Sequence, residues 1–252
     1  MVKTSKLFSH AGISARGVRY TDSNGRSHRA FVRGKGEVIL SAGAIGSPQL
    51  LLLSGVGPQS YLSSLKIPVV YPQPHTGNFM YDNPRNFINI LSPFPLEPST
   101  VKIVGITDHF YVETISSGPI SSIPFSIFPD PTKHIEINSS WGLLCIKLEG
   151  PLSYGALKLQ SSSDVKTGPS VRFNYYADPL DLAYCVSGVK LIRELLNTES
   201  LKAYKVQVSS STKAYKFYGP TLPTNETDDA SFEQFCRDTV STYWHFHGGC
   251  LV

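Results

Sequence analysis

The 252-residue sequence lacks the features that mark three special classes of protein. Its longest apolar run, at Leu50–Leu53, is far too short to span a bilayer. None of its four cysteines has the Cys-x-x-Cys spacing of a structural zinc site. The basic residues are scattered and the formal net charge is only +4, so we expect neither nucleic acid nor a membrane as a partner.

We also expect no signal peptide, because the residues after Met1 contain no apolar h-region; alone, this would predict a cytosolic protein. What the sequence does contain is a hydrophobic fraction of 41% and a charged fraction of 17%, as in globular proteins with a substantial core. Its length suffices for one large domain or two small ones, and it has no internal repeat.

The N-terminal part has the pattern of strands followed by a helix. Apolar and polar residues alternate at Gly17–Tyr20 and Ala30–Arg33, with turn residues at Asp22–Gly25 between them. The run at Glu37–Leu40 is more continuously apolar and predicts a buried strand. Pro48 is expected in the first turn of a helix over Gln49–Leu53, and the glycines that follow end it.

The segment from Ile67 to Asn86 is interrupted by four prolines, so we expect a loop or lid there. A β-rich part follows, in which a proline-rich stretch at 119–131 separates the second strand from the third. The expected strands are Val101–Ile106, Phe110–Ile115, Trp141–Leu148 and Ala156–Leu159.

Two helices are expected after these strands. Asp178-Pro179 predicts the start of the first, with aspartate at the N-cap and proline at the first helical position. A shorter helix is expected over Ala230–Thr239. The first helix presents one apolar face, made of Leu182, Cys185, Val186, Val189, Ile192 and Leu196.

The C-terminal stretch Tyr243–Gly249 alternates aromatic residues with His245 and His247 and ends in a Gly-Gly pair. Histidine exchanges protons near neutral pH, and glycine lets the backbone approach a planar ligand closely. The residues alone allow three interpretations: a general base beside a flat cofactor, a His-x-His metal site, or a core strand with satisfied histidines.

Two stretches together resemble one known family. Gly43–Gly57, preceded by Glu37–Ala42, resembles the second signature of the glucose–methanol–choline (GMC) flavin oxidoreductases. Tyr243–Gly249 resembles the version found in the (R)-mandelonitrile lyase branch of plant GMC proteins, as do Met80–Phe87 and Gly150–Gly155. His75–Asp82 is similar to the family's Gly-x-Asn-aliphatic-x-Asp segment, except that Phe79 replaces the Asn.

The resemblance implies an α+β or α/β fold in which an incomplete Rossmann-like domain for FAD, over residues 1–86, precedes a substrate domain of sheet and helices. We expect the substrate domain at 87–228 and a return to the FAD domain at 229–252. The resemblance also implies a disulfide between Cys185 and Cys236; the alternative is four buried thiols.

Two parts of the family pattern are missing. The chain has no Gly-x-Gly-x-x-Gly turn for the FAD pyrophosphate, and it ends before the family's Asn-Pro-Gln-like stretch. We therefore expect the middle of a longer enzyme, and weak or no FAD binding by this piece alone. The parent is expected to be a secreted or vacuolar monomer, and the sequons at Asn138 and Asn225 suggest a glycoprotein.

The implied site residues follow from the same resemblance. His245 is expected to be the catalytic acid and base, Tyr243 and Glu113 to bind substrate, and Trp244 with His245 to lie against FAD; no metal is expected. His247 would point to the opposite face of an extended segment and be structural. Glu113 stands where the lyase branch has a cysteine.

The expected activity is cleavage of a cyanohydrin to an aldehyde and hydrogen cyanide. One alternative is an FAD-dependent alcohol oxidase or dehydrogenase, in which the same histidine takes the hydroxyl proton while hydride goes to the flavin. Another alternative is a non-catalytic remnant or a ligand-binding module. For the lyase and for the oxidase or dehydrogenase, the expected partner is a small molecule, a cyanohydrin or an alcohol.

Overall fold

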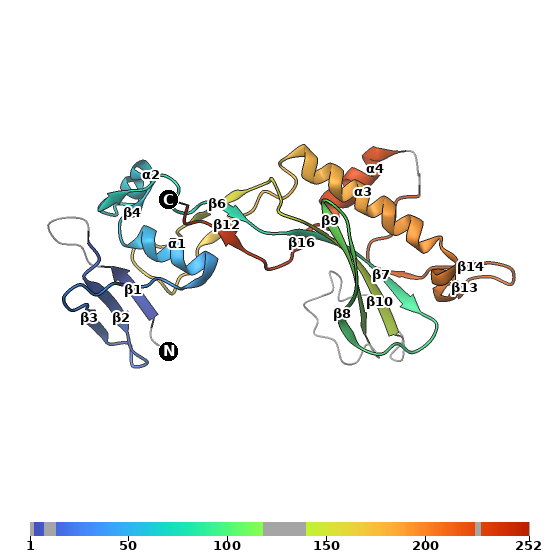
Figure 1. Cartoon of the computed structure of the whole chain (residues 1–252), viewed down its shortest axis with the longest axis horizontal. Coiled ribbons are helices and arrows are strands. Elements are labelled where there is room, and N and C mark those ends of the chain that lie inside the picture. Colours follow the sequence, from blue (N-terminus) through green and yellow to red (C-terminus); the bar gives the residue numbers. More distant parts are fainter. Residues whose placement is uncertain (1–2, 8–13, 118–139, 225–227, 252) are drawn as a thin grey trace. The chain divides into compact units, whose positions relative to one another are not determined.

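The computed structural model describes residues 3–7, 14–117, 140–224 and 228–251. The chain divides into two compact units, shown in Figure 1. Unit 1 comprises Met1–Asp82, Ser153–Asn174 and Trp244–Val252, and unit 2 comprises Asn83–Leu152 and Tyr175–Tyr243.

Unit 1 contains two helices, two small sheets and a short parallel strand pair among its described residues. Its elements are β1 (Lys3–Leu7), β2 (Gly17–Thr21), β3 (Ser27–Phe31), α1 (Gly43–Leu53), β4 (Val56–Gly57), α2 (Gln59–Ser64), β5 (Tyr71–Pro72), β6 (Asn78–Tyr81), β11 (Gly155–Lys158), β12 (Ser170–Arg172) and β17 (His247–Gly248). The strands β1, β2 and β3 form a meander, and a four-stranded sheet has the order β12-β11-β6-β17.

The turn between β2 and β3 forms as predicted. The side chain of Asp22 accepts hydrogen bonds from the backbone N–H groups of Asn24 and Arg26, at 2.9 and 2.8 Å. Gly25 takes a φ of +81°, which the turn requires.

Two predictions for this unit are wrong. Glu37–Leu40 is not a strand: no described strand pairs with it, Val38 and Leu40 are only partly buried, and Ile39 is 84% exposed. Helix α1 begins at Gly43 rather than near Gln49, so Pro48 lies inside it. Because proline has no N–H to donate to the carbonyl of Ala44, that helical hydrogen bond is missing.

Unit 2 is built on an antiparallel sheet covered by helices. Its elements are β7 (Pro84–Ser92), β8 (Ser99–Ile106), β9 (Phe110–Ser117), β10 (Ser140–Leu148), α3 (Pro179–Leu196), the 3-10 helix η3 (Glu199–Tyr204), β13 (Val206–Gln207), β14 (Lys213–Ala214), β15 (Phe217–Tyr218), α4 (Asp229–Thr239) and β16 (Ser241–Thr242). The sheet order is β15-β7-β10-β9-β8, and β16 also pairs with β7. Figure 1 shows α3 and α4 beside each other in this unit.

The prediction of a loop up to Asn86 is also wrong, because strand β7 already begins at Pro84. Pro84 is its first residue, a position that does not need a backbone N–H for the ladder. The strand is central, since it pairs with β10 and β15. The expected strands at β8, β9 and β10 are confirmed, whereas β11 belongs to the sheet of unit 1.

Helix α3 has the predicted start and the predicted buried face. The Asp178 side chain caps it by accepting the N–H of Leu180 at 2.9 Å. The six apolar residues of its predicted face are all buried, and they pack with Phe232 of α4 and the sheet residues Ile146 and Leu148. Cys185 and Cys236 form a disulfide between α3 and α4, which confirms that pairing.

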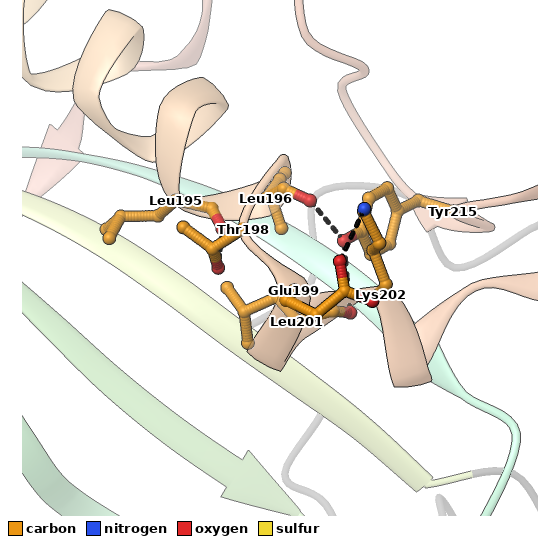
Figure 2. A network of polar contacts seen from close by, with 7 residues as sticks. All are labelled: Leu195, Leu196, Thr198, Glu199, Leu201, Lys202 and Tyr215. Atoms are coloured by element: carbon orange, nitrogen blue, oxygen red, sulfur yellow. Dashed lines mark hydrogen bonds and ion pairs between the residues drawn. The ribbon is translucent and has the colours of Figure 1, made fainter.

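The C-terminal end of α3 is fixed by side-chain hydroxyl groups (Figure 2). The hydroxyl of Tyr215 has one proton, which the carbonyls of Leu196 and Leu201 share, and the hydroxyl of Thr198 donates to the carbonyl of Leu195. The bonds to Leu195 and Leu196 reach carbonyls in the last turn of α3, which lack an internal helical partner, and Leu201 lies in η3.

Asn86 on β7 joins the sheet to the helices. Its side chain is 1% exposed, donates to Cys236 O and Thr239 Oγ1, and accepts the hydroxyl proton of Tyr176. We expect Asn86→Ala to lower the free energy of unfolding by about 3 kcal/mol, because it leaves buried polar groups unpaired. Urea denaturation measures this. The control Asn78→Ala, which removes a more exposed hydrogen bond to Pro74 O, should cost less than about 1 kcal/mol.

The expected domain boundaries at 86 and 228 do not coincide with the two units. Residues 153–174 fall in unit 1 because β11 pairs with β6, and α4 falls in unit 2 because the disulfide and apolar packing join it to α3. The stretch at 119–131 and both sequon asparagines lie outside the described residues. Across the described ranges, no helix has both the length and the apolar character that crossing a bilayer requires.

Candidate functional site

The loop that carries His245 in unit 1 is anchored through its backbone. The N–H of His245 donates to Oδ1 of Asp82 at 2.8 Å, and the Asp82 side chain is 1% exposed. The ring of Phe246 stacks on that of Phe173, with centroids 5.1 Å apart. The side chain of His245 itself is exposed. The arrangement holds an accessible imidazole on a fixed backbone.

The segment around His245 is not an extended strand. Trp244 has a φ of +59°, so the expected alternation of side chains from Tyr243 to His247 does not apply. Strand β17 begins only at His247. The His247 ring stacks on that of Tyr81, with centroids 5.2 Å apart, and its Nδ1 donates to the carbonyl of His245 at 2.9 Å. These contacts fit the structural role proposed for His247.

The two glycines after His247 allow a very close approach of β17 to β6. Gly248 has a φ of +82°, and a Cβ there would lie 1.9 Å from the carbonyl oxygen of Phe79. That carbonyl accepts the N–H of Gly249 at 3.2 Å. Phe79 itself has a φ of +55°, a left-handed conformation that asparagine tolerates better than phenylalanine.

The other predicted site residues, Tyr243 and Glu113, lie together in unit 2. The hydroxyl of Tyr243 donates to Oε2 of Glu113, whose side chain is 7% exposed. Two cations make cation–π contacts with the Tyr243 ring. The distance to the ring centroid is 5.3 Å from the Arg85 guanidinium and 5.1 Å from the Lys147 ammonium. Burial, and then the Glu113 carboxylate, raise the pKa of Tyr243, so the phenol stays neutral.

Three further residues of this cluster were not predicted as site residues. Arg85 belongs to the strand that was expected to be a loop. Cys145 and Lys147 are two residues apart on β10, and this spacing places both on one face of the strand. Cys145 lies opposite Glu113 in the β9–β10 register. Burial raises the pKa of Cys145 to about 12, so this thiol is protonated at neutral pH and is not a nucleophile.

The start of α1 offers backbone donors to an anion. Ala42 and Gly43 are exposed, the first turn has no acidic residue, and no side chain caps the helix. Free N–H groups at a helix N-terminus attract phosphate. A metal site is not found: among the described residues, no three His, Cys, Asp or Glu side chains lie close enough together to hold a metal ion.

Comparison with known proteins identifies the family. Models of the GMC oxidoreductase family match residues 1–79 and 151–251. The chain is 57% identical over 247 residues to (R)-mandelonitrile lyase 1 from Prunus serotina, covering 98% of this chain and 44% of that protein. It is 43% identical over 243 residues to a sinalpyl alcohol oxidase from Nesocodon mauritianus, covering 96% of this chain and 44% of the relative.

The fold agrees with these matches. A structure of a formate oxidase variant from Aspergillus oryzae aligns with a TM-score of 0.79 at 19% identity, over 98% of this chain and 50% of that one. The α+β fold of a partial GMC protein is thereby confirmed. The chain spans less than half the length of the curated relatives that it matches. With both family models and these relatives in agreement, the chain belongs to the GMC oxidoreductase family.

Proposed function

We propose that the protein containing this chain is an FAD-dependent (R)-mandelonitrile lyase-like enzyme that cleaves a cyanohydrin to an aldehyde and hydrogen cyanide. The observation that carries this proposal is the exposed imidazole of His245 on a backbone held by the buried Asp82. The identity of 57% to a lyase of this kind supports it.

His245 acts as general base and then as general acid. Its imidazole takes the hydroxyl proton of the cyanohydrin, the carbonyl forms, and the bond to the nitrile carbon breaks with its electron pair leaving as cyanide. The imidazolium returns its proton to cyanide. No group is oxidised or reduced overall.

The Tyr243 cluster, taken by itself, has a neutral hydrogen-bonding group and positive charge. Tyr243 binds the substrate hydroxyl through its phenol oxygen. Arg85 and Lys147, the two cations on the Tyr243 ring, favour the departure of an anion such as cyanide. Glu113 offsets part of that charge.

The residues present fit FAD in two places. The uncapped start of α1 suits a phosphate-bearing group, and the 57% exposed Trp244 offers a planar surface beside His245 in the sequence. When bound, FAD supplies a planar ring that can accept a hydride. Since the chain has no Gly-x-Gly-x-x-Gly turn, we expect it to bind FAD weakly on its own.

An FAD-dependent alcohol oxidase is the second candidate, and Glu113 favours it. A carboxylate in this cluster disfavours a leaving cyanide anion, and a relative with 43% identity is an alcohol oxidase. In that reaction His245 takes the alcohol proton in the same way.

The disulfide supports a secreted or vacuolar location, because such bonds persist in oxidising compartments.

The experiment that separates these candidates supplies mandelonitrile and benzyl alcohol to the full-length flavoprotein. Benzaldehyde and cyanide from mandelonitrile, with the flavin absorbance unchanged, support the lyase. Bleaching of the flavin by benzyl alcohol without cleavage of mandelonitrile supports the oxidase. Turnover of neither compound would contradict both proposals for these substrates.

A further inference from the structure

We propose that a groove in unit 1, formed by β6, β11 and β12, is an additional ligand site that binds an aromatic carboxylate with a hydroxyl group on its ring. The groove has a volume of about 740 Å³, which is in the range of small-molecule sites. None of the residues that line it has a role in the proposed reaction, so the inference does not depend on that reaction.

The groove follows from the register of β11 and β12. Ala156 lies opposite Arg172, and Ser170 lies opposite Lys158. Directly opposed residues share one face of a sheet, so a small side chain stands across from each long cationic one. Because alanine and serine fill little of this face, space remains between the two cationic side chains, and all four residues line it.

The groove carries positive charge that no carboxylate offsets. No aspartate or glutamate is among the described residues that line it. Arg172 is exposed, and it has no hydrogen bond or ion pair with any part of the chain that the structure describes. Lys158 makes a cation–π contact with Tyr61, 4.4 Å from Nζ to the ring centroid. Since a guanidinium binds a carboxylate through two parallel hydrogen bonds, Arg172 is the expected contact of an anionic group.

Two aromatic rings line the same groove. The centroids of Phe79 and Tyr154 are 4.9 Å apart with an angle of 32° between the rings, and His75 lies edge-on to Phe79 at 5.3 Å. The Tyr154 side chain is 49% exposed, so its ring can be contacted from the solvent. Phe79 keeps its φ of +55° at an energetic cost, and such strained residues are frequent where ligands bind. Exposed rings attract another ring through stacked or edge contacts, so the ligand is aromatic.

Two asparagine side chains offer acceptors to a hydroxyl group. Nδ2 of Asn78 donates to the carbonyl of Pro74 at 2.8 Å, and Nδ2 of Asn174 donates to the carbonyl of Tyr154 at 3.1 Å. Both side chains line the groove, and their amide oxygens remain to accept. A hydroxyl group on the ligand's ring can donate to one of them.

The test measures binding of 4-hydroxybenzoate to the full-length flavoprotein by calorimetry, with 4-hydroxybenzamide as its uncharged match. We expect the acid to bind about tenfold more tightly than the amide, the effect of a charge-assisted hydrogen bond to an exposed arginine. Arg172→Gln should remove this difference. Tyr154→Ala should weaken binding of both compounds about fivefold, because a ring contact is lost.

The control is Arg26→Gln, which changes an exposed arginine in the turn between β2 and β3 and should leave both dissociation constants unchanged. Arg85→Gln tests binding at the Tyr243 cluster instead. The inference is wrong if the affinity for 4-hydroxybenzoate falls in Arg85→Gln but not in Arg172→Gln. Equal affinities for acid and amide, or no binding to the unsubstituted protein, would also overturn it. Because no turnover is needed, loss of the proposed reaction would leave this result interpretable.

Discussion

Gly248→Ala should reduce turnover of the full-length enzyme by at least about 100-fold, because a displacement of about 1 Å in catalytic groups has an effect of this size. The new Cβ would lie 1.9 Å from the carbonyl oxygen of Phe79, and the φ of +82° is unfavourable for alanine. The pairing of β17 with β6 must open to relieve the contact. The loop with His245 moves with it.

The matched control is Gly25→Ala. Gly25 has a φ of +81°, but its Cβ would meet no atom within 4 Å. Its substitution isolates the conformational cost, about 1–2 kcal/mol, from the steric contact. Turnover should stay unchanged in Gly25→Ala, and equal losses of turnover in both variants would show that the close approach of β17 to β6 is unimportant.

Removing the disulfide should have the largest effect on stability. We expect the double variant Cys185→Ser with Cys236→Ser to lose about 4 kcal/mol of unfolding free energy, from the loop-entropy model for a separation of 51 residues. That is a large part of the 5–15 kcal/mol that typical domains have. Guanidinium denaturation followed by circular dichroism measures the loss.

The control for this experiment is the exposed free thiol of Cys250. Cys250→Ser should change the midpoint of denaturation little, since the site is open to solvent. A double variant as stable as the unsubstituted chain would mean that packing between α3 and α4, rather than the covalent bond, holds these helices together.

Local patterns predicted the parts of the fold that local chemistry determines. The start of α3 follows from Asp178-Pro179, because a carboxylate cap and a proline act within one turn. The apolar face of α3 follows from its spacing alone. The turn at Asp22 is of the same kind.

Predictions failed where the outcome depends on distant partners. The prolines before Asn86 indicated a loop, yet Pro84 occupies the one end of a strand that proline tolerates. Glu37–Leu40 has the composition of a buried strand, but burial needs a neighbour that the described residues do not supply. Composition alone cannot reveal whether such a neighbour exists.

The candidate site was predictable only in part for the same reason. A motif resemblance singled out His245, Tyr243 and Glu113, but the cations on the Tyr243 ring come from strands far apart in the sequence. Nothing local to Arg85 or Lys147 indicates that they meet one aromatic ring. Only the register of β7 and β10 reveals it.

The most direct measurement compares His245→Ala with His247→Ala in the full-length flavoprotein, using cyanide release from mandelonitrile. We expect His245→Ala to lower kcat at least about 100-fold, the usual contribution of a general acid–base group, with the flavin still bound. We expect His247→Ala, which loses only the stacking on Tyr81 and the hydrogen bond to the loop, to keep most activity. Retained cyanide release in His245→Ala would contradict the assignment of His245 as the proton-transferring group.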